Sequence, residues 1–209
     1  MRFCIGDCCK WLITQRPAVN YAVKSHAAGA LALTQVNIDT RPMPDMALLA
    51  RYRAPGNYVD CLCADVDGSV DIASFAAAFL TSRAFRLERW LLGALLGKRS
   101  SDGQAAELAT GAASQFAAWT VEARSSDQLI LRDFLGHTRS WLMTEPIMRE
   151  GAGAATRLHF GTAVVHIGLS GFARTRAVTL FWLLLPFHKI YARVLLGSAV
   201  RRLISQTAN

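Results

Sequence analysis

The sequence is poor in cysteine and in charge, and both shortages exclude classes of protein. Its five cysteines are an odd number and include the adjacent pair Cys8 and Cys9, which argues against the disulfide framework of a small secreted domain. Charged residues make up 18% of the chain and apolar residues 52%. This balance excludes general disorder and permits a sizeable core.

A long hydrophobic run is also missing. The most apolar stretch, residues 177–187, contains Pro186 and has about half the length of a helix that crosses a bilayer. We interpret it as a core element and leave a role at a membrane surface open. The apolar segments after Met1 are interrupted by Asp7 and Arg16, so no signal peptide is predicted and we expect a cytoplasmic protein.

Motifs for metals, cofactors and nucleophilic catalysis are absent from the sequence. No two histidines stand four apart on a predicted helix and no Cys-x-x-Cys recurs, so we expect no zinc site. No phosphate-binding loop and no glycine fingerprint follow a predicted strand, so no cofactor is expected. The stretch 168–171 (Gly-Leu-Ser-Gly) lacks the first half of a nucleophile elbow.

What the chain does carry is an excess of positive charge. It has 23 lysines and arginines against 15 acidic residues, for a net charge of +8. The arginines are spread along the chain and accompany no recognition motif, so we expect a solvated basic surface and no nucleic-acid partner.

The first 44 residues show no sustained hydrophobic period and are predicted to be a poorly patterned extension. Met43 and Met46 stand where patterned sequence begins, and our hypothesis is that translation starts at one of them. Residues 45–209 are predicted to form one domain.

The first half of that domain reads as a strand followed by two helices. Residues 58–66 alternate with Val59, Cys61 and Cys63 on one face, which predicts two buried thiols rather than a metal pair. Asp71 is a predicted N-cap for a helix through Leu80. A second helical stretch covers 85–95 with Gly97 as its stop, and 100–103 is predicted to be a loop.

The second half reads as an antiparallel meander and a long helix. Strands are predicted at 116–124, 129–134, 137–145 and 155–167, the first with Trp119 and Ala123 on one side. The last helix has apolar Ile190, Val194 and Leu195. The predicted fold class is α+β, a curved antiparallel sheet packed on a long C-terminal helix (helix-grip), an arrangement that commonly leaves a cavity between the two.

Three blocks of sequence resemble a bacterial family, the domain of unknown function 2867 (DUF2867). They are 132–143 (RDFLGHTRSWLM), 156–165 (TRLHFGTAVV) and 186–188 (PFH), the last preceded by Phe181 and Trp182. The resemblance runs from about residue 58 to 203. It implies a START-like (SRPBCC-like) helix-grip domain, and it implies no activity, because none is established for the family.

The function that we predict is a binding module, not an enzyme, holding a small hydrophobic or amphipathic ligand between sheet and C-terminal helix. The alternative is that the same aromatic residues fill a solid core. Candidate ligand-binding residues are Trp119, Phe134, His137, Trp141, Phe160, Trp182 and His188.

The orientation of one strand stays open at this point. His137, Arg139, Trp141 and Met143 share a face that lines either a cavity or solvent, while the alternates Thr138, Ser140 and Thr144 resemble surface residues.

Two other functions also stay open. One is an enzyme on the same fold, cyclase-like or hydratase-like, with His137 or His188 as general acid or base. For His188 the simpler interpretation is a hydrogen bond to a nearby backbone carbonyl. The other is a membrane-surface or protein-interaction module that uses the basic final helix and the apolar stretch ahead of it.

Overall fold

The computed structural model describes residues 36–97, 100–149, 153–165 and 171–207, and the side chains of residues 95–96, 171–184 and 207 lie outside this description. Within these segments no helix is long and apolar enough to cross a membrane.

The helices and strands of the described segments follow one another in this order: β1 (Asp39–Thr40), η1 (Leu48–Tyr52), β2 (Tyr58–Asp67), α1 (Ile72–Leu80), α2 (Arg83–Leu96), α3 (Asp102–Thr110), β3 (Gln115–Phe116), β4 (Trp119–Arg124), β5 (Gln128–Asp133), β6 (Thr138–Arg149), β7 (Gly153–Val164) and α4 (Gly171–Thr207).

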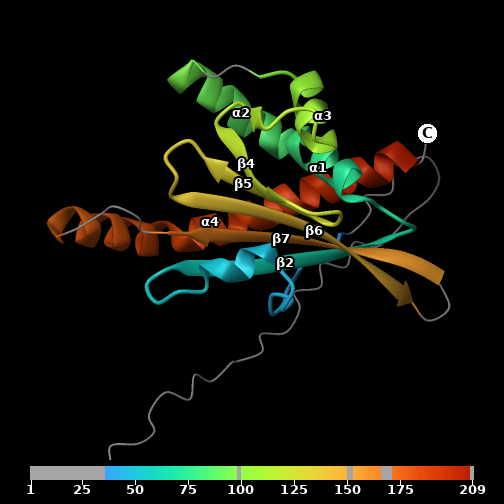
Figure 1. Ribbon diagram of the computed structural model, residues 1–209, viewed down its shortest axis with the longest axis horizontal. Coiled ribbons are helices and arrows are strands. Elements are labelled where there is room, and N and C mark those ends of the chain that lie inside the picture. Colours follow the sequence, from blue (N-terminus) through green and yellow to red (C-terminus); the bar gives the residue numbers. More distant parts are fainter. Residues whose placement is uncertain (1–35, 98–99, 150–152, 166–170, 208–209) are drawn as a thin grey trace, which may run out of the picture. The chain divides into compact units, whose positions relative to one another are not determined.

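The strands of the described segments form one open, curved sheet of seven strands in the order β1-β2-β7-β6-β5-β4-β3 (Figure 1). Every neighbouring pair is antiparallel. The long central pair β6–β7 runs from Thr138 opposite Val164 to Arg149 opposite Gly153. These two twelve-residue strands form the middle of the sheet.

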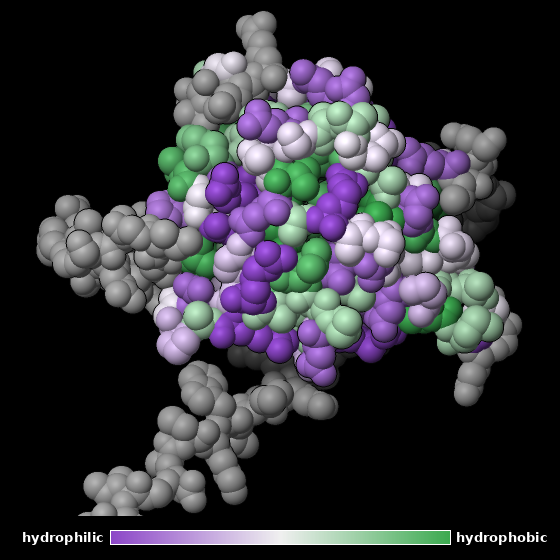
Figure 2. All heavy atoms as spheres, in the orientation of Figure 1, coloured by the Kyte–Doolittle hydropathy of each residue, from purple (hydrophilic) through white to green (hydrophobic). Residues whose placement is uncertain are grey.

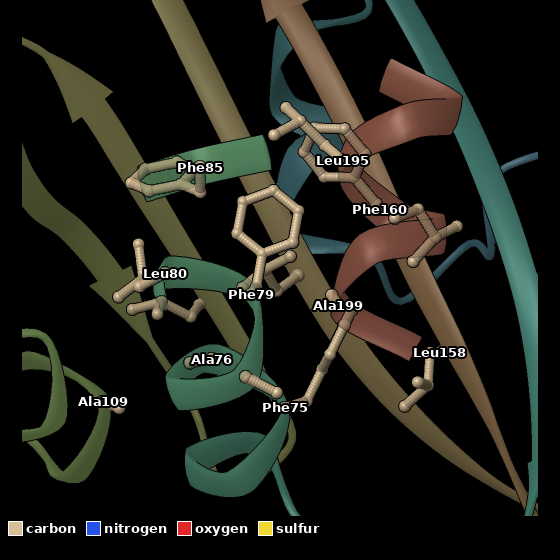
Figure 3. Packing of buried hydrophobic residues seen from close by; sticks show 14 of the residues in the cluster. Phe75, Ala76, Phe79, Leu80, Phe85, Ala109, Leu158, Phe160, Leu195 and Ala199 are labelled. Atoms are coloured by element: carbon tan, nitrogen blue, oxygen red, sulfur yellow. The ribbon is translucent and has the colours of Figure 1, made fainter. Parts of the chain in front are cut away.

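Helices α1 and α4 cover one face of this sheet and bury the main core. Phe79 of α1 lies 4.9 Å from Phe160 of β7 and 5.5 Å from Phe85 of α2, measured between ring centroids. Leu195 and Ala199 of α4 approach the same cluster (Figure 3). A curved antiparallel sheet packed on a C-terminal helix is the helix-grip-like α+β arrangement, so the predicted fold class is confirmed.

The other face of the sheet carries η1. Leu49 of η1 is fully buried and lies close to Gly161, where an added Cβ would come within 2.9 Å of its side chain and 2.8 Å of the Trp141 ring. Gln128 fastens the segment: its Oε1 accepts from the backbone N–H of Leu48 at 2.7 Å and from the Trp141 indole at 2.9 Å. Its Nε2 donates to the Met46 carbonyl at 3.1 Å.

Several local predictions are confirmed. β2 occupies the predicted strand, and Cys61 and Cys63 are free and buried. The Asp71 carboxylate accepts from the Ser74 N–H at 2.6 Å as an N-cap. Gly97 ends α2 with φ of 67°, a left-handed conformation that glycine adopts without a steric penalty.

Other local predictions are wrong. Residues 100–103 are not a loop throughout, because Ser101 and Gln104 form a capping box that starts α3. The predicted strand 116–124 divides at Ala117, which has φ of 52°, and a bulge between Val121 and Ala123 shifts the register. Trp119 therefore packs in the core under α4, whereas Ala123 packs against the cluster under η1.

The final helix is confirmed, but it differs from the prediction in which of its apolar side chains are buried. It begins at Gly171, so the apolar stretch 177–187 is part of it and Pro186 lies inside it. Ile190 and Val194 are exposed, and the buried residues of α4 include Ala192, Leu195 and Leu196.

Residues just before position 45 belong to the packed structure. Asp39 and Thr40 pair with Cys63 and Leu62 of β2, and Met43 is buried under η1. Most of the predicted extension, residues 1–35, lies outside the described segments.

Candidate functional site

Two of the predicted ligand-binding residues are core residues. Trp119 and Phe160 are buried between the sheet and the helices. Trp119 lies 4.8 Å from Phe85 and Phe160 lies 4.9 Å from Phe79, between ring centroids. These distances are those of packed aromatic pairs, so at these positions aromatic side chains fill the space between sheet and helix.

Three other predicted residues are placed apart from that core. Trp141 is fully buried, but on the opposite face of the sheet beneath η1. Phe134 is exposed in the turn between β5 and β6. Trp182 lies in α4, and its side chain is outside the described part of the structure. The four aromatic residues whose side chains are described, Trp119, Phe134, Trp141 and Phe160, thus do not line one pocket.

The structure shows what covers the face of β6 that carries Arg139, Trp141 and Met143. Arg139, Trp141 and Met143 are buried under η1, so their face meets neither α4 nor open solvent. Arg139 Nε donates to Glu122 Oε2 at 3.0 Å, and its guanidinium lies 5.0 Å from the Tyr52 ring centroid.

His137, the residue before β6, is partly buried. Its Nδ1 is inaccessible and has no hydrogen-bond partner among the described residues. It lies outside both of the clusters described below.

His188 is the predicted residue that does meet functional groups. It lies on α4 beside the start of β2, with its Nε2 3.7 Å from Asp60 Oδ2 and its ring 6.0 Å from that of Tyr58 in an edge-to-face arrangement. The Tyr58 hydroxyl donates to Asp60 Oδ2 at 2.8 Å, and the Thr162 N–H donates to Asp60 Oδ1 at 2.9 Å. Tyr58, Asp60 and His188 form what we call the β2–α4 cluster.

The register of three strands shows why polar groups gather there. Leu62, Phe160 and Leu142 lie side by side on β2, β7 and β6, and all three belong to the core under α4. On the same face of the sheet, two residues away from each of these apolar residues, the next set of neighbours is polar. We call this set, Asp60, Thr162 and Ser140, the polar row.

The polar row begins where the apolar core ends. Thr162 is buried, and the side chain of Asp60 is 15% exposed. An antiparallel sheet that is apolar along most of one face and polar at one end can hold a molecule that is itself apolar with a polar end.

Burial favours the neutral forms of His188 and Tyr58. Burial lowers the pKa of His188 below its usual value of 6.5, and the nearby Lys189 adds to this, although the field of Asp60 opposes both. Burial also raises the pKa of Tyr58, so the phenol stays protonated and donates to Asp60.

One nitrogen of His188 is left without a partner. Nε2 is inaccessible and makes no hydrogen bond within the described segments, since 3.7 Å to Asp60 is too long for one. The predicted bond to a backbone carbonyl is not seen at this nitrogen. A buried polar atom of this kind is uncommon in folded proteins and calls for an explanation, such as a bound water or another hydrogen-bonding group.

A second cluster lies on the η1 face. His159 Nε2 is 2.9 Å from Glu145 Oε2, and His159 Nδ1 is 3.8 Å from Cys61 Sγ. The order thiol, imidazole, carboxylate is that of an activated nucleophile.

The environment of this thiol argues against nucleophilic catalysis. Burial raises the pKa of Cys61 to about 12, so the reactive thiolate is scarce at neutral pH. Burial likewise lowers the pKa of His159 despite the neighbouring Glu145. Cys61 is 3% exposed, and we assign this cluster a structural role.

Sequence reasoning missed Tyr58 and Asp60, and it did not connect Glu145 with His159. The alternation Tyr58, Asp60, Leu62 was visible in the sequence, but which face α4 covers and which strands neighbour β2 depend on register. Register is set by contacts that are distant in sequence.

The comparisons with known proteins add no assignment. No family model matches the chain, and no curated protein or solved structure is significantly similar to it. Among the described residues, no group of three or more histidine, cysteine or acidic side chains is placed to hold a metal ion.

Proposed function

We propose that this protein is a binding module for a small amphipathic molecule, held at the end of the sheet where α4 crosses the polar row. The observation that carries the proposal is the buried Nε2 of His188 above Asp60, which makes no hydrogen bond within the described part of the chain. The ligand's polar group would hydrogen-bond this nitrogen, and Ser140 of the polar row would be within the same site.

The chemistry of the cluster narrows the class of ligand. Both oxygens of Asp60 already accept hydrogen bonds, from Thr162 and Tyr58. The neutral His188 offers one further acceptor or donor, depending on its tautomer. An uncharged hydroxyl or carbonyl fits this site better than a carboxylate, which the charge of Asp60 would repel.

The proposal also includes a family and a cellular location: a bacterial, START-like DUF2867 domain that acts in the cytoplasm. The three sequence blocks and the helix-grip-like arrangement of the sheet and α4 support the family.

Native mass spectrometry of the protein, purified without steps that strip small molecules, tests the proposal. We expect a mass above that of the polypeptide and a bound compound with an apolar body and a hydroxyl or carbonyl group. The variants His188→Phe and Ser140→Val should each weaken its binding by about tenfold, the effect of losing one hydrogen bond.

The matched control is Met148→Leu, because Met148 is exposed near the far end of β6. It should bind as the unchanged protein does. A bound compound that neither His188→Phe nor Ser140→Val affects would place the ligand elsewhere and contradict the proposal.

A second candidate function uses the same residues. Asp60 lies close enough to orient the His188 ring after a small movement, and a neutral imidazole beside a carboxylate can act as a general base. In that case the bound compound would be chemically altered on incubation. The rate would fall as pH drops through the lowered pKa of His188, whereas simple binding returns the compound unchanged.

A further inference from the structure

The outer side of α4 exposes large apolar side chains in a line. Phe187, Ile190 and Val194 are spaced three and four residues apart, so they form one stripe along the helix. They point away from the buried side that carries Leu195, Leu196 and Ala199. This stripe is therefore not part of the core.

Helix α2 extends the apolar stripe sideways. The Ser198 hydroxyl accepts from the Ala84 N–H at 3.3 Å, and the Tyr191 hydroxyl donates to Glu88. The two helices therefore lie antiparallel and in contact. On α2 the next exposed apolar positions beside this contact are Leu87 and Leu91, followed by Trp90.

The result is one surface across two helices, which we call the α2–α4 surface. Its six apolar side chains are each between 45% and 69% exposed, and they are Leu87, Trp90, Leu91, Phe187, Ile190 and Val194. Together they present an area on the order of several hundred Å², the range in which exposed apolar patches mark an interaction site.

The charges around this surface are mainly positive, and its two acidic neighbours, Glu88 and Asp102, are paired with Tyr191 and with the arginines Arg86 and Arg89. Helix α4 contains no acidic residue in 37 positions, and the basic side chains in its described part are Lys189, Arg193, Arg201 and Arg202. The single acidic residue of α2 is Glu88, which is engaged with Tyr191. Arg83 and Arg201 are exposed at one end of the surface.

We propose that the α2–α4 surface docks on an anionic phospholipid membrane. Exposed apolar side chains enter the interface while lysines and arginines at their edge meet the negative head groups, which is how surface-bound amphipathic helices bind membranes. Docking by this surface does not depend on the ligand at the β2–α4 cluster.

Vesicle flotation with the full-length protein tests the proposal. The probes are vesicles of phosphatidylcholine alone and of phosphatidylcholine with about 30% phosphatidylglycerol, a content at which anionic lipid sets the surface potential. We expect binding to the anionic vesicles at least about tenfold above that to the neutral ones, and a large loss of binding at high salt because salt screens the attraction.

Two variants assign the binding to this surface. Ile190→Ser with Val194→Ser removes apolar contact, and Arg83→Glu with Arg201→Glu reverses charge, so each pair should reduce binding by about tenfold or more. All four side chains are exposed, and thermal melting checks that the variants fold. Their matched controls, Met148→Ser and Arg132→Glu, change exposed residues elsewhere on the sheet and should bind as before.

Three results would overturn the proposal. The first is equal binding to neutral and anionic vesicles, or none to either. The second is anionic binding that both variant pairs leave unchanged. The third is a dimer in solution that Ile190→Ser with Val194→Ser dissociates, which would assign the surface to a second copy of the chain. Ligand retention measured on the same variants tests the β2–α4 cluster separately, because none of these changes touches its three residues.

Discussion

The two faces of the sheet are held in different ways. Under α1 and α4 the core consists of phenylalanine, leucine and alanine side chains in direct contact (Figure 3). Under η1 a small apolar cluster is enclosed by hydrogen-bonded polar groups, among them Gln128, the pair Arg139–Glu122 and the pair His159–Glu145. In the space-filling view, hydrophilic and hydrophobic residues are intermixed on the side of the molecule facing the viewer (Figure 2).

This difference separates two sources of stability. Apolar burial has no preferred direction and tolerates small shifts, whereas a buried hydrogen-bonded group loses most of its contribution when one partner is removed. The α4 face should therefore respond to lost volume and the η1 face to lost partners. At the polar row, which lies at the edge of the apolar face, the apolar core ends and His188 Nε2 makes no hydrogen bond within the described segments. Neither apolar burial nor hydrogen bonding therefore stabilises this place fully.

The largest expected effect comes from emptying the apolar face. Phe79→Ala removes a ring that contacts Phe75, Phe85 and Phe160 and is 1% exposed. We expect a loss of about 3–5 kcal/mol in the free energy of unfolding, the usual range for a buried Phe→Ala change. Urea denaturation measures it, and a loss below about 1 kcal/mol would mean that this core is loosely packed.

The η1 face should be most sensitive at Gln128. Gln128→Ala leaves the Trp141 indole and the Leu48 N–H without their acceptor, and each buried unpaired donor costs about 1–3 kcal/mol. We expect a loss of about 2–4 kcal/mol and faster amide exchange confined to η1. Exchange that accelerates equally across α4 would contradict the separation of the two faces.

A smaller effect is expected where η1 approaches the sheet most closely. Gly161→Ala places a methyl group 2.8 Å from the Asp60 carbonyl and from the Trp141 ring and 2.9 Å from the Leu49 side chain, so the surroundings must shift. Overpacking of this kind costs about 1–3 kcal/mol. If Leu49 is the main obstacle, Gly161→Ala should cost less stability in a Leu49→Ala background than in the unchanged protein. Equal costs in the two backgrounds would mean that the methyl group meets the Asp60 carbonyl or the Trp141 ring instead.

The smallest effect is a pH dependence to which both faces contribute. Burial lowers the pKa of His188 and His159 below 6.5 in the folded state, so at lower pH the unfolded chain binds more protons. Stability is then complete above pH 6.5 and decreases as pH falls from 6.5 toward the folded-state pKa values. Glu88, whose pKa is raised by burial, acts in the opposite direction.

Because of that opposing group, the pH effect is read as a difference between variants. The loss of stability between pH 7.5 and pH 5.5 should be smaller in His188→Phe and in His159→Phe than in the unchanged protein. Urea midpoints at the two pH values measure it. An equal loss in all three proteins would show that neither histidine titrates abnormally.

The sequence predicted the regular parts of the fold well. Strand alternation located β2, β5, β6 and β7 to within a few residues, and Asp71 and Gly97 marked helix ends through their local chemistry. These features depend on neighbours in sequence, which is why a single sequence contains them.

The parts that were missed depend on contacts between distant residues. The bulge at Val121 moved Ala123 to the other face, and the close approach at Gly161 allowed η1 to cover Trp141. Neither has a periodic signature. The same holds for the candidate site, where His188 was predicted but its partners Tyr58 and Asp60 were not, because they meet it only through the packing of α4 on β2.

The most direct test of the central claim is a high-resolution structure of the protein purified with its small molecules retained. We predict non-protein density within hydrogen-bonding distance of His188 Nε2, beside Asp60 and Ser140. A structure in which His188 bonds directly to Asp60 and side chains fill the space above the polar row would contradict it.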